Sequence, residues 1–203
     1  CLTESAHPET YTLSLHDPLP IYVAKAKDHL AKAMAALKIA DPAAIAIEFL
    51  TSDTDRSRAQ AEIVQDQLQK NLGIKVSVKQ VPYRQRLDME SKKTFETVFT
   101  GWAPDYSDPM TYLELWTSDS PYNHGSYRSA KYDEYIAFAR KSTDKKARMD
   151  AMFNAEKELL ADGAIIPMQL RRESLLLNPA FTGVSTYFIG TNYDLVHADR
   201  AAK

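Results

Sequence analysis

The 203-residue sequence carries a formal net charge of −2, and 44% of its residues are hydrophobic and 26% charged. This composition is ordinary for a globular protein with a sizeable core. Acidic and basic residues are interspersed, so no basic stripe could follow a phosphate backbone, and the sequence predicts no nucleic-acid partner.

Cysteine usage and hydropathy bound the compartment only loosely. No run of about 18 apolar residues could span a bilayer, and no basic segment followed by an apolar one marks a signal peptide. Either the protein is cytosolic or its true start lies upstream. The single cysteine is Cys1, which excludes an intrachain disulfide and a cysteine-based metal site. Such sparse use of cysteine fits both the cytosol and many bacterial exported proteins.

Residues 1–21 have neither helical nor strand periodicity, and Pro8, Pro18 and Pro20 interrupt them. The segment resembles the translation of a sequencing adaptor. We therefore expect a non-native or disordered leader and exclude it from the fold prediction.

After the leader, apolar residues recur at spacings of three and four, with lysines mostly on the other face. This pattern predicts an amphipathic helix that ends before Pro42. Residues 45–50, IAIEFL, then predict a buried strand. Asp53 or Thr54 can cap a second helix, which ends at Gly73, where glycine supplies a left-handed conformation.

Alternating apolar and polar residues predict a strand with one covered face over residues 74–81. Later segments predict helices over 83–92, 110–116, 129–141 and 144–160, and strands over 96–100 and 164–170. Pro167 indicates that the last strand is an edge or bulged strand, because proline cannot donate to a ladder.

Strands that alternate with helices predict an α/β lobe, with helices covering both faces of a partly parallel, mixed sheet. We expect this lobe over residues 22–175. The tail, residues 176–203, is rich in Asn, Gly, Thr and Tyr with little periodicity. We expect the tail to leave the lobe and dock elsewhere.

The loop Gly101–Pro109, GWAPDYSDP, places aromatic and acidic residues directly after a predicted strand. Open α/β sheets bind ligands at this end of their strands. Asp108 precedes a proline and is suited to cap the next helix, which leaves Asp105 as the residue of interest. A buried Asp105 beside Trp102 would suit a cationic ligand group. The alternative is a hydrolase that uses Asp105 and Asp108 as general acid and base.

Other constellations predict no chemistry. His124 lies in a polar, turn-rich loop without a nucleophile or an orienting group, so we expect a solvated histidine. No histidine pair has metal-ligand spacing, and no glycine-rich phosphate loop is present. The sequence therefore predicts no catalytic residue, no metal and no cofactor.

The order of these features resembles the C-terminal portion of the extracytoplasmic solute-binding proteins of peptide-type ABC importers, the bacterial extracellular solute-binding protein family 5. Five segments carry the resemblance: residues 24–30 AKAKDHL, 68–76 LQKNLGIKV, 100–109 TGWAPDYSDP, 156–167 EKELLADGAIIP and 190–195 GTNYDL.

The resemblance implies a two-lobed, type II periplasmic-binding-protein fold, of which this chain would be a fragment. It would hold most of the second lobe, and residues 176–203 would return to the first lobe. The implied function is non-enzymatic: an extracytoplasmic, monomeric receptor captures short peptides and delivers them to a membrane permease.

The resemblance also implies site residues. Asp105 would bind the peptide's α-amino group, Trp102 would wall a side-chain pocket, and the backbone of Ala103 would pair with the extended peptide. Tyr83 is the fourth predicted ligand-binding residue. Two departures leave the ligand open. Arginines that some members direct at the peptide carboxylate are replaced near Glu90 and Phe99. Pro104 is also compatible with family ligands such as metal chelates, haem and oligosaccharides.

Overall fold

The computed structural model describes residues 23–168, 176–187 and 193–200, which form two compact units. The first unit holds the chain up to Met89 together with Thr94–Phe99. The second unit holds Glu90–Lys93 and the chain from Thr100 onward. The predicted leader lies outside the described residues, and the predicted boundaries at residues 21–22 and 175–176 fall at the margins of the described ranges.

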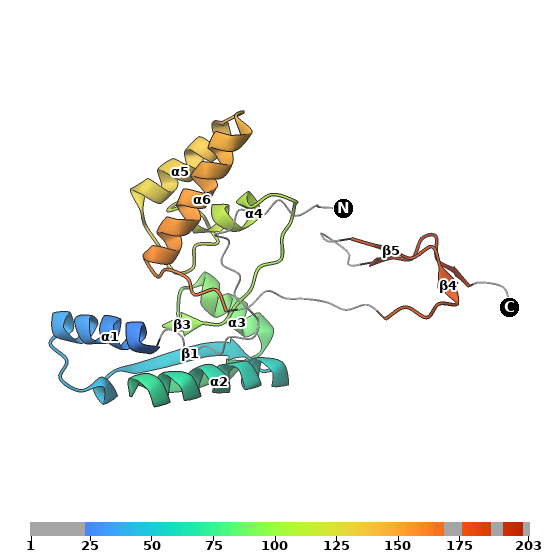
Figure 1. Ribbon diagram of the computed structural model, residues 1–203. Coiled ribbons are helices and arrows are strands. Elements are labelled where there is room, and N and C mark those ends of the chain that lie inside the picture. Colours follow the sequence, from blue (N-terminus) through green and yellow to red (C-terminus); the bar gives the residue numbers. More distant parts are fainter. Residues whose placement is uncertain (1–22, 169–175, 188–192, 201–203) are drawn as a thin grey trace. The chain divides into compact units, whose positions relative to one another are not determined.

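A three-stranded sheet is the centre of the first unit (Figure 1). Its strands are β1 (Ala46–Ser52), β2 (Lys75–Val81) and β3 (Thr97–Val98), in the order β2-β1-β3. Both pairings are parallel, with Ala46 opposite Lys75 and Phe49 opposite Thr97. β1 is the central strand of this sheet. Its last three residues, Leu50-Thr51-Ser52, are all buried, as is usual for a strand inside a parallel sheet.

Three helices belong wholly or mostly to this unit: α1 (Val23–Leu37), α2 (Asp55–Leu72) and α3 (Tyr83–Ser91). Helix α2 packs on both β1 and β2, along the sheet (Figure 1). It begins where the Thr54 hydroxyl accepts a hydrogen bond from the Ser57 N–H at 3.2 Å, and it ends at Gly73, whose φ is 72°. Both ends are those that the sequence predicts, and Thr54 is the residue that caps.

The second unit is built on two long helices, α5 (Ala130–Lys141) and α6 (Lys145–Ala161), which pack side by side (Figure 1). Ser129 and Asp144 cap their N-termini through their side-chain oxygens. A short helix, α4 (Met110–Leu113), continues as a 3₁₀ turn over Glu114–Trp116 and also packs on α6.

The core of the second unit lies between these helices. Its buried members are Met110, Leu113, Tyr132, Ile136, Ala139, Ala151, Met152, Ala155 and Leu159. Within α5 and α6 they recur mainly at spacings of three and four, which places them on one face of each helix. Alanines on both helices let the two backbones approach, and Tyr132 fills the remaining space with no exposed surface. Its hydroxyl donates to the Leu113 carbonyl at 2.6 Å, so the buried polar group is satisfied.

The described part of the tail forms two short antiparallel ladders. Strand β4 (Phe181–Thr182) pairs with β7 (Asp199–Arg200), and β5 (Ser185–Thr186) pairs with β6 (Tyr193–Asp194). Gly183 lies between β4 and β5 with φ of 72°, and a Cβ there would lie 1.9 Å from the His197 carbonyl oxygen. Only glycine fits this turn.

The predicted α/β class is confirmed, and so are the helices and the first three strands, within a few residues at their ends. The main sheet is parallel, and among the described strands antiparallel pairing occurs only in the two separate ladders of the tail. The predicted strand over 164–170 is wrong for Ala164–Met168, which form no strand, and its last two residues lie outside the described ranges. Pro167 offers no N–H to a ladder, and Ile166 is exposed.

Tyr132→Phe tests the polar anchor in this core. Removal of the hydroxyl leaves the buried Leu113 carbonyl without its partner, so the free energy of unfolding should fall by about 1–2 kcal/mol. Chemical denaturation of the full chain measures the change. Tyr135→Phe, on the same helix and half-buried, is the matched control and should change the free energy of unfolding by less than about 0.5 kcal/mol. Equal losses in the two variants would contradict the anchoring role.

Candidate functional site

The loop between β3 and α4 begins with an irregular segment, Gly101–Pro104. Gly101, Trp102 and Ala103 are exposed. Within the described residues, no backbone N–H or C=O of this segment bonds to another backbone group. The segment therefore leaves its backbone donors and acceptors to water or to a ligand.

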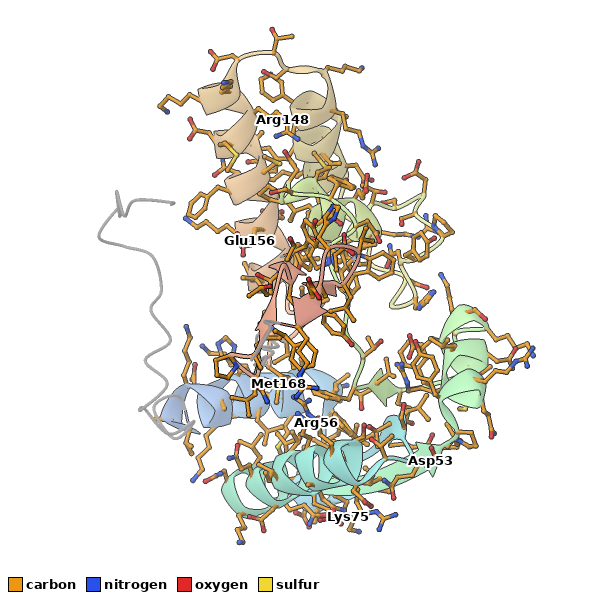
Figure 2. The ribbon with its side chains drawn as sticks, turned by 90° about the vertical axis from the view of Figure 1, so that its right-hand side faces the viewer. Asp53, Arg56, Lys75, Arg148, Glu156 and Met168 are labelled. Atoms are coloured by element: carbon orange, nitrogen blue, oxygen red, sulfur yellow. The ribbon has the colours of Figure 1, made fainter. Side chains whose placement is uncertain are left out.

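Asp108 fixes the far end of the loop. Its carboxylate accepts hydrogen bonds from both terminal nitrogens of Arg148, at 2.7 and 2.9 Å, and from the Met110 N–H at 2.9 Å. Arg148 belongs to α6 (Figure 2). The hydrogen bonds from Arg148 lower the pKa of Asp108, with burial acting in the opposite direction. Asp108 thus binds the first N–H of α4, as the sequence predicts, although Pro109 occupies the N-cap position itself. The arginine partner, 40 residues away, has no local signal in the sequence.

Asp105 is held only through its backbone. Its N–H donates to the hydroxyl of Thr111 at 3.0 Å, and Thr111 is itself only 2% exposed. The carboxylate is exposed and has no hydrogen-bond or ion-pair partner among the described residues. The expectation of a buried Asp105 is therefore wrong. A carboxylate without a cation is costly to bury, and Asp105 stays in water instead.

The rings of Trp102 and Tyr122 pack against each other. The ring centroids are 5.1 Å apart and the planes meet at 65°, which is a favourable edge-to-face arrangement. Both side chains remain substantially exposed, at 39% and 54%. Tyr106 adds a third exposed ring, and its hydroxyl donates to Glu114 at 2.6 Å. Burial and the Glu114 carboxylate raise the pKa of Tyr106 to about 12, so this hydroxyl stays protonated.

Tyr83, the fourth predicted ligand-binding residue, opens α3 in the first unit. Its ring is 59% exposed, and the Arg86 guanidinium lies over it at 5.1 Å from the centroid. Tyr83 is thus an accessible aromatic surface with a cation on one face. Its role toward a ligand stays a prediction.

A second loop, residues 117–127, carries Tyr122 and is organised around Asn123. The Asn123 side chain, 2% exposed as a residue, donates to the carbonyls of Thr117 and Tyr127 at 3.1 and 2.7 Å. Its amide oxygen accepts the Tyr127 N–H at 2.9 Å. Three hydrogen bonds from one buried amide hold the loop closed, so Tyr122 projects from a fixed base.

His124 lies in the same loop, and the expectation of a solvated histidine is wrong. Its side chain is 26% exposed, and Nδ1 lies 3.6 Å from the carboxylate of Glu90. Glu90 is 3% exposed. The sequence gives no local signal for this pair, because its members are far apart in the chain. The sequence singled out Glu90 only because it lies near a position where some family members have arginine.

The ion pair of Asp108 with Arg148 does not suit the general acid of the hydrolase alternative. A general acid at neutral pH needs a raised pKa, whereas the pKa of Asp108 is lowered by Arg148.

Within the described ranges, no group of three or more His, Cys, Asp or Glu side chains could hold a metal ion. No described helix combines the length and apolar character needed to cross a membrane.

Residues 3–124 match the model of a protein family, "Bacterial extracellular solute-binding proteins, family 5 Middle". The chain belongs to this family of solute-binding proteins. The matched range begins within the leader that the fold prediction excludes.

Relatives with known names agree with this family. The chain is 35% identical over 150 residues to the "Dipeptide-binding protein" of Lactococcus lactis subsp. cremoris, which covers 72% of this chain and 27% of that protein. It is 30% identical over 135 residues to the "Periplasmic oligopeptide-binding protein OppA" of Salmonella typhimurium, covering 66% of this chain and 25% of the relative. The chain thus spans about a quarter of the length of these relatives.

Solved structures share the fold. The substrate-binding domain of an oligopeptide ABC transporter from Bacillus anthracis is 34% identical with a TM-score of 0.78, over 89% of this chain and 35% of that chain. "Listeria monocytogenes OppA bound to peptide" is 31% identical with a TM-score of 0.76, over 89% of this chain and 34% of that chain. The α/β lobe is therefore of the kind that peptide-transporter binding proteins contain.

Arg148→Met tests the anchor of the site loop. Loss of the bidentate pair should lower the free energy of unfolding by about 1–2 kcal/mol at pH 7. The pKa of Asp108 is lowered in the folded state, so the stabilisation is present above the unfolded value of about 3.9 and is lost as pH falls through the folded value. The difference between wild type and variant in denaturant titrations should therefore shrink below about pH 4.

Arg140→Met is the matched control for this experiment. Arg140 is exposed and lies 3.6 Å from Glu114, so its loss should lower the free energy of unfolding by no more than about 0.5 kcal/mol. A loss in Arg148→Met that is the same at pH 3 and pH 7 would contradict the assigned pair.

Proposed function

We propose that this chain is part of the substrate-binding component of an ABC importer, which captures short peptides outside the cytoplasm and delivers them to a membrane permease. Support comes from membership of the solute-binding family and from relatives named for dipeptides and oligopeptides. The name of the Salmonella relative places that protein in the periplasm, which supports an extracytoplasmic site of action.

The observation that carries the proposal is the exposed carboxylate of Asp105, which has no partner among the described residues and follows the exposed Trp102 by three positions. A peptide presents one ammonium group at a fixed distance from its first side chain. In the proposed complex, Asp105 accepts charge-assisted hydrogen bonds from that ammonium group. Such bonds contribute roughly 1.5–3 kcal/mol each when the pair is shielded from water.

The neighbouring segment suits the rest of an extended peptide. Backbone groups of Trp102 and Ala103 can pair with the peptide main chain as a neighbouring strand does. The exposed faces of Trp102 and Tyr122 then form the wall of a side-chain pocket. Tyr83 is proposed as a further ligand-binding residue.

The proposed whole protein has two lobes that close on the peptide by hinge motion. Residues 22–175 belong to the second lobe in this proposal, and residues 176–203 return toward the first lobe. The exposed Tyr187 and Tyr193 and the short ladders of the tail would meet that lobe. We propose a monomer, with the permease as its partner in the membrane.

Asp105→Asn tests the ammonium contact in the complete protein that contains this chain. Affinity for short peptides should fall by roughly 30-fold or more, because the peptide ammonium is left without its counter-ion in the closed site. Isothermal titration calorimetry measures the change. N-acetylated peptides lack the ammonium group, so they should bind weakly and with the same affinity to wild type and to the variant. Asp150→Asn, another exposed aspartate of the second unit, should leave affinity unchanged.

Two outcomes would overturn this assignment. Unchanged affinity in Asp105→Asn, or wild-type binding that is indifferent to N-acetylation, removes Asp105 from the ammonium site. Mass spectrometry of compounds that copurify with the complete protein addresses the ligand class. A metal chelate, haem or oligosaccharide found there, with no peptide binding in calorimetry, would replace peptide as the ligand.

A further inference from the structure

Glu90 connects the start of the site loop to the loop that carries Tyr122. Its carboxylate accepts a hydrogen bond from the Thr100 hydroxyl at 3.4 Å and lies 3.6 Å from Nδ1 of His124. Glu90 also has interactions beyond these two. A carboxylate that is only 3% exposed needs partners, because an unpaired buried charge is costly. These contacts therefore help to hold both loops in place.

Lys93, three residues after Glu90, makes a second connection. Its ammonium donates to the Ser126 hydroxyl at 2.8 Å. Ser126 has φ of 56°, a left-handed conformation that is uncommon for serine, and it closes the turn after His124. One short segment, Glu90–Lys93, thus holds two points of the same turn.

The position of His124 is transmitted to Tyr122 through a tight turn. The His124 N–H donates to the Tyr122 carbonyl at 2.8 Å. Asn123, between them, is fixed by three hydrogen bonds of its side chain. A shift of the His124 backbone therefore acts on the backbone of Tyr122. The Tyr122 ring in turn packs against the Trp102 ring in an edge-to-face arrangement.

We propose that Glu90 and His124 form a positioning pair that holds Tyr122 against Trp102 and thereby sets the side-chain selectivity of the binding site. This inference rests on the proposed peptide-binding function for its consequence, but the placement of Tyr122 is independent of any ligand. Glu90 and His124 touch no proposed ligand group; they act through Tyr122.

The proposed division of roles separates affinity from selectivity. Asp105 meets the ammonium group, which every unmodified peptide carries, so it contributes equally to all of them. The Trp102–Tyr122 wall meets a side chain, which differs among peptides. A change in the wall therefore alters the spread of affinities across a peptide series and leaves the Asp105 contribution in place.

The first test reads the wall directly and needs no ligand. Trp102 and Trp116 are the only tryptophans, so Trp116→Phe makes Trp102 the single emitter. Acrylamide quenching then reports how well Tyr122 covers Trp102. His124→Ala and Glu90→Gln should each raise the quenching constant by half of the rise seen in Tyr122→Ala, or more. Lys131→Met, which breaks an exposed ion pair with Glu158, is the control and should change nothing.

A conservative variant separates positioning from simple folding. His124→Asn places an amide nitrogen near the position of Nδ1 and should restore quenching to the wild-type value, whereas His124→Ala should not. If Trp116→Phe fails to fold, nuclear Overhauser contacts between the Trp102 and Tyr122 rings in the otherwise unchanged chain give the same readout. Wild-type quenching in both His124→Ala and Glu90→Gln, with increased quenching in Tyr122→Ala, would overturn the positioning pair. So would His124→Asn behaving as His124→Ala does.

The second test uses the complete protein and peptides that differ in one side chain. In wild type, the ratio between the weakest and the tightest dissociation constant of the series defines the spread of affinities. Calorimetry should show that His124→Ala lowers this ratio at least threefold, whereas Asp105→Asn weakens the binding of every peptide. A narrowed spread supports the selectivity role, and an unchanged spread overturns it. If wild type binds no peptide at all, the proposed function fails, and the quenching result still decides whether Glu90 and His124 position Tyr122.

Discussion

The bidentate ion pair between Asp108 and Arg148 gives the site loop a defined end. Asp108 also accepts the first N–H of α4, so one carboxylate joins the loop, a helix start and α6. Arg148 presents a planar pair of donors that fixes orientation as well as distance. The position of Asp105, three residues before the anchor, follows from this arrangement and from its bond to the buried Thr111.

The site combines polar groups that bond within the protein with polar groups that face solvent. Asn123, Asp108 and Glu90 all direct their polar groups at other parts of the second unit. The carboxylate of Asp105 and the backbone of Gly101–Pro104 make no such contacts among the described residues. Polar groups that are used internally specify shape, whereas those left to water are available for recognition. In the proposed receptor, the first set limits the ordering cost of binding and the second set supplies the contacts.

Sequence reasoning succeeded where the physics is local. Apolar periodicity located the long helices, and Thr54 and Gly73 marked the ends of α2, because caps depend on a few adjacent residues. Asp108 was recognised as a cap for the same reason. The same reasoning failed for Arg148, Glu90 and His124, whose partners lie tens of residues away. Asp105 was considered as a buried partner of a cationic ligand group, yet the burial of a carboxylate depends on which cation the fold places beside it, and proximity in the sequence does not give that.

The backbone of Gly101–Ala103, which pairs with no other backbone group among the described residues, has a consequence for hydration. Where these peptide groups face solvent, water satisfies their hydrogen bonds. An extended peptide main chain would replace those waters group for group, so the number of hydrogen bonds changes little and the released water contributes entropy. Because every peptide carries the same main chain, this exchange is blind to side chains. In the proposed receptor, such an edge would accept many peptide sequences, and the side chains of Trp102 and Tyr122 would discriminate among them.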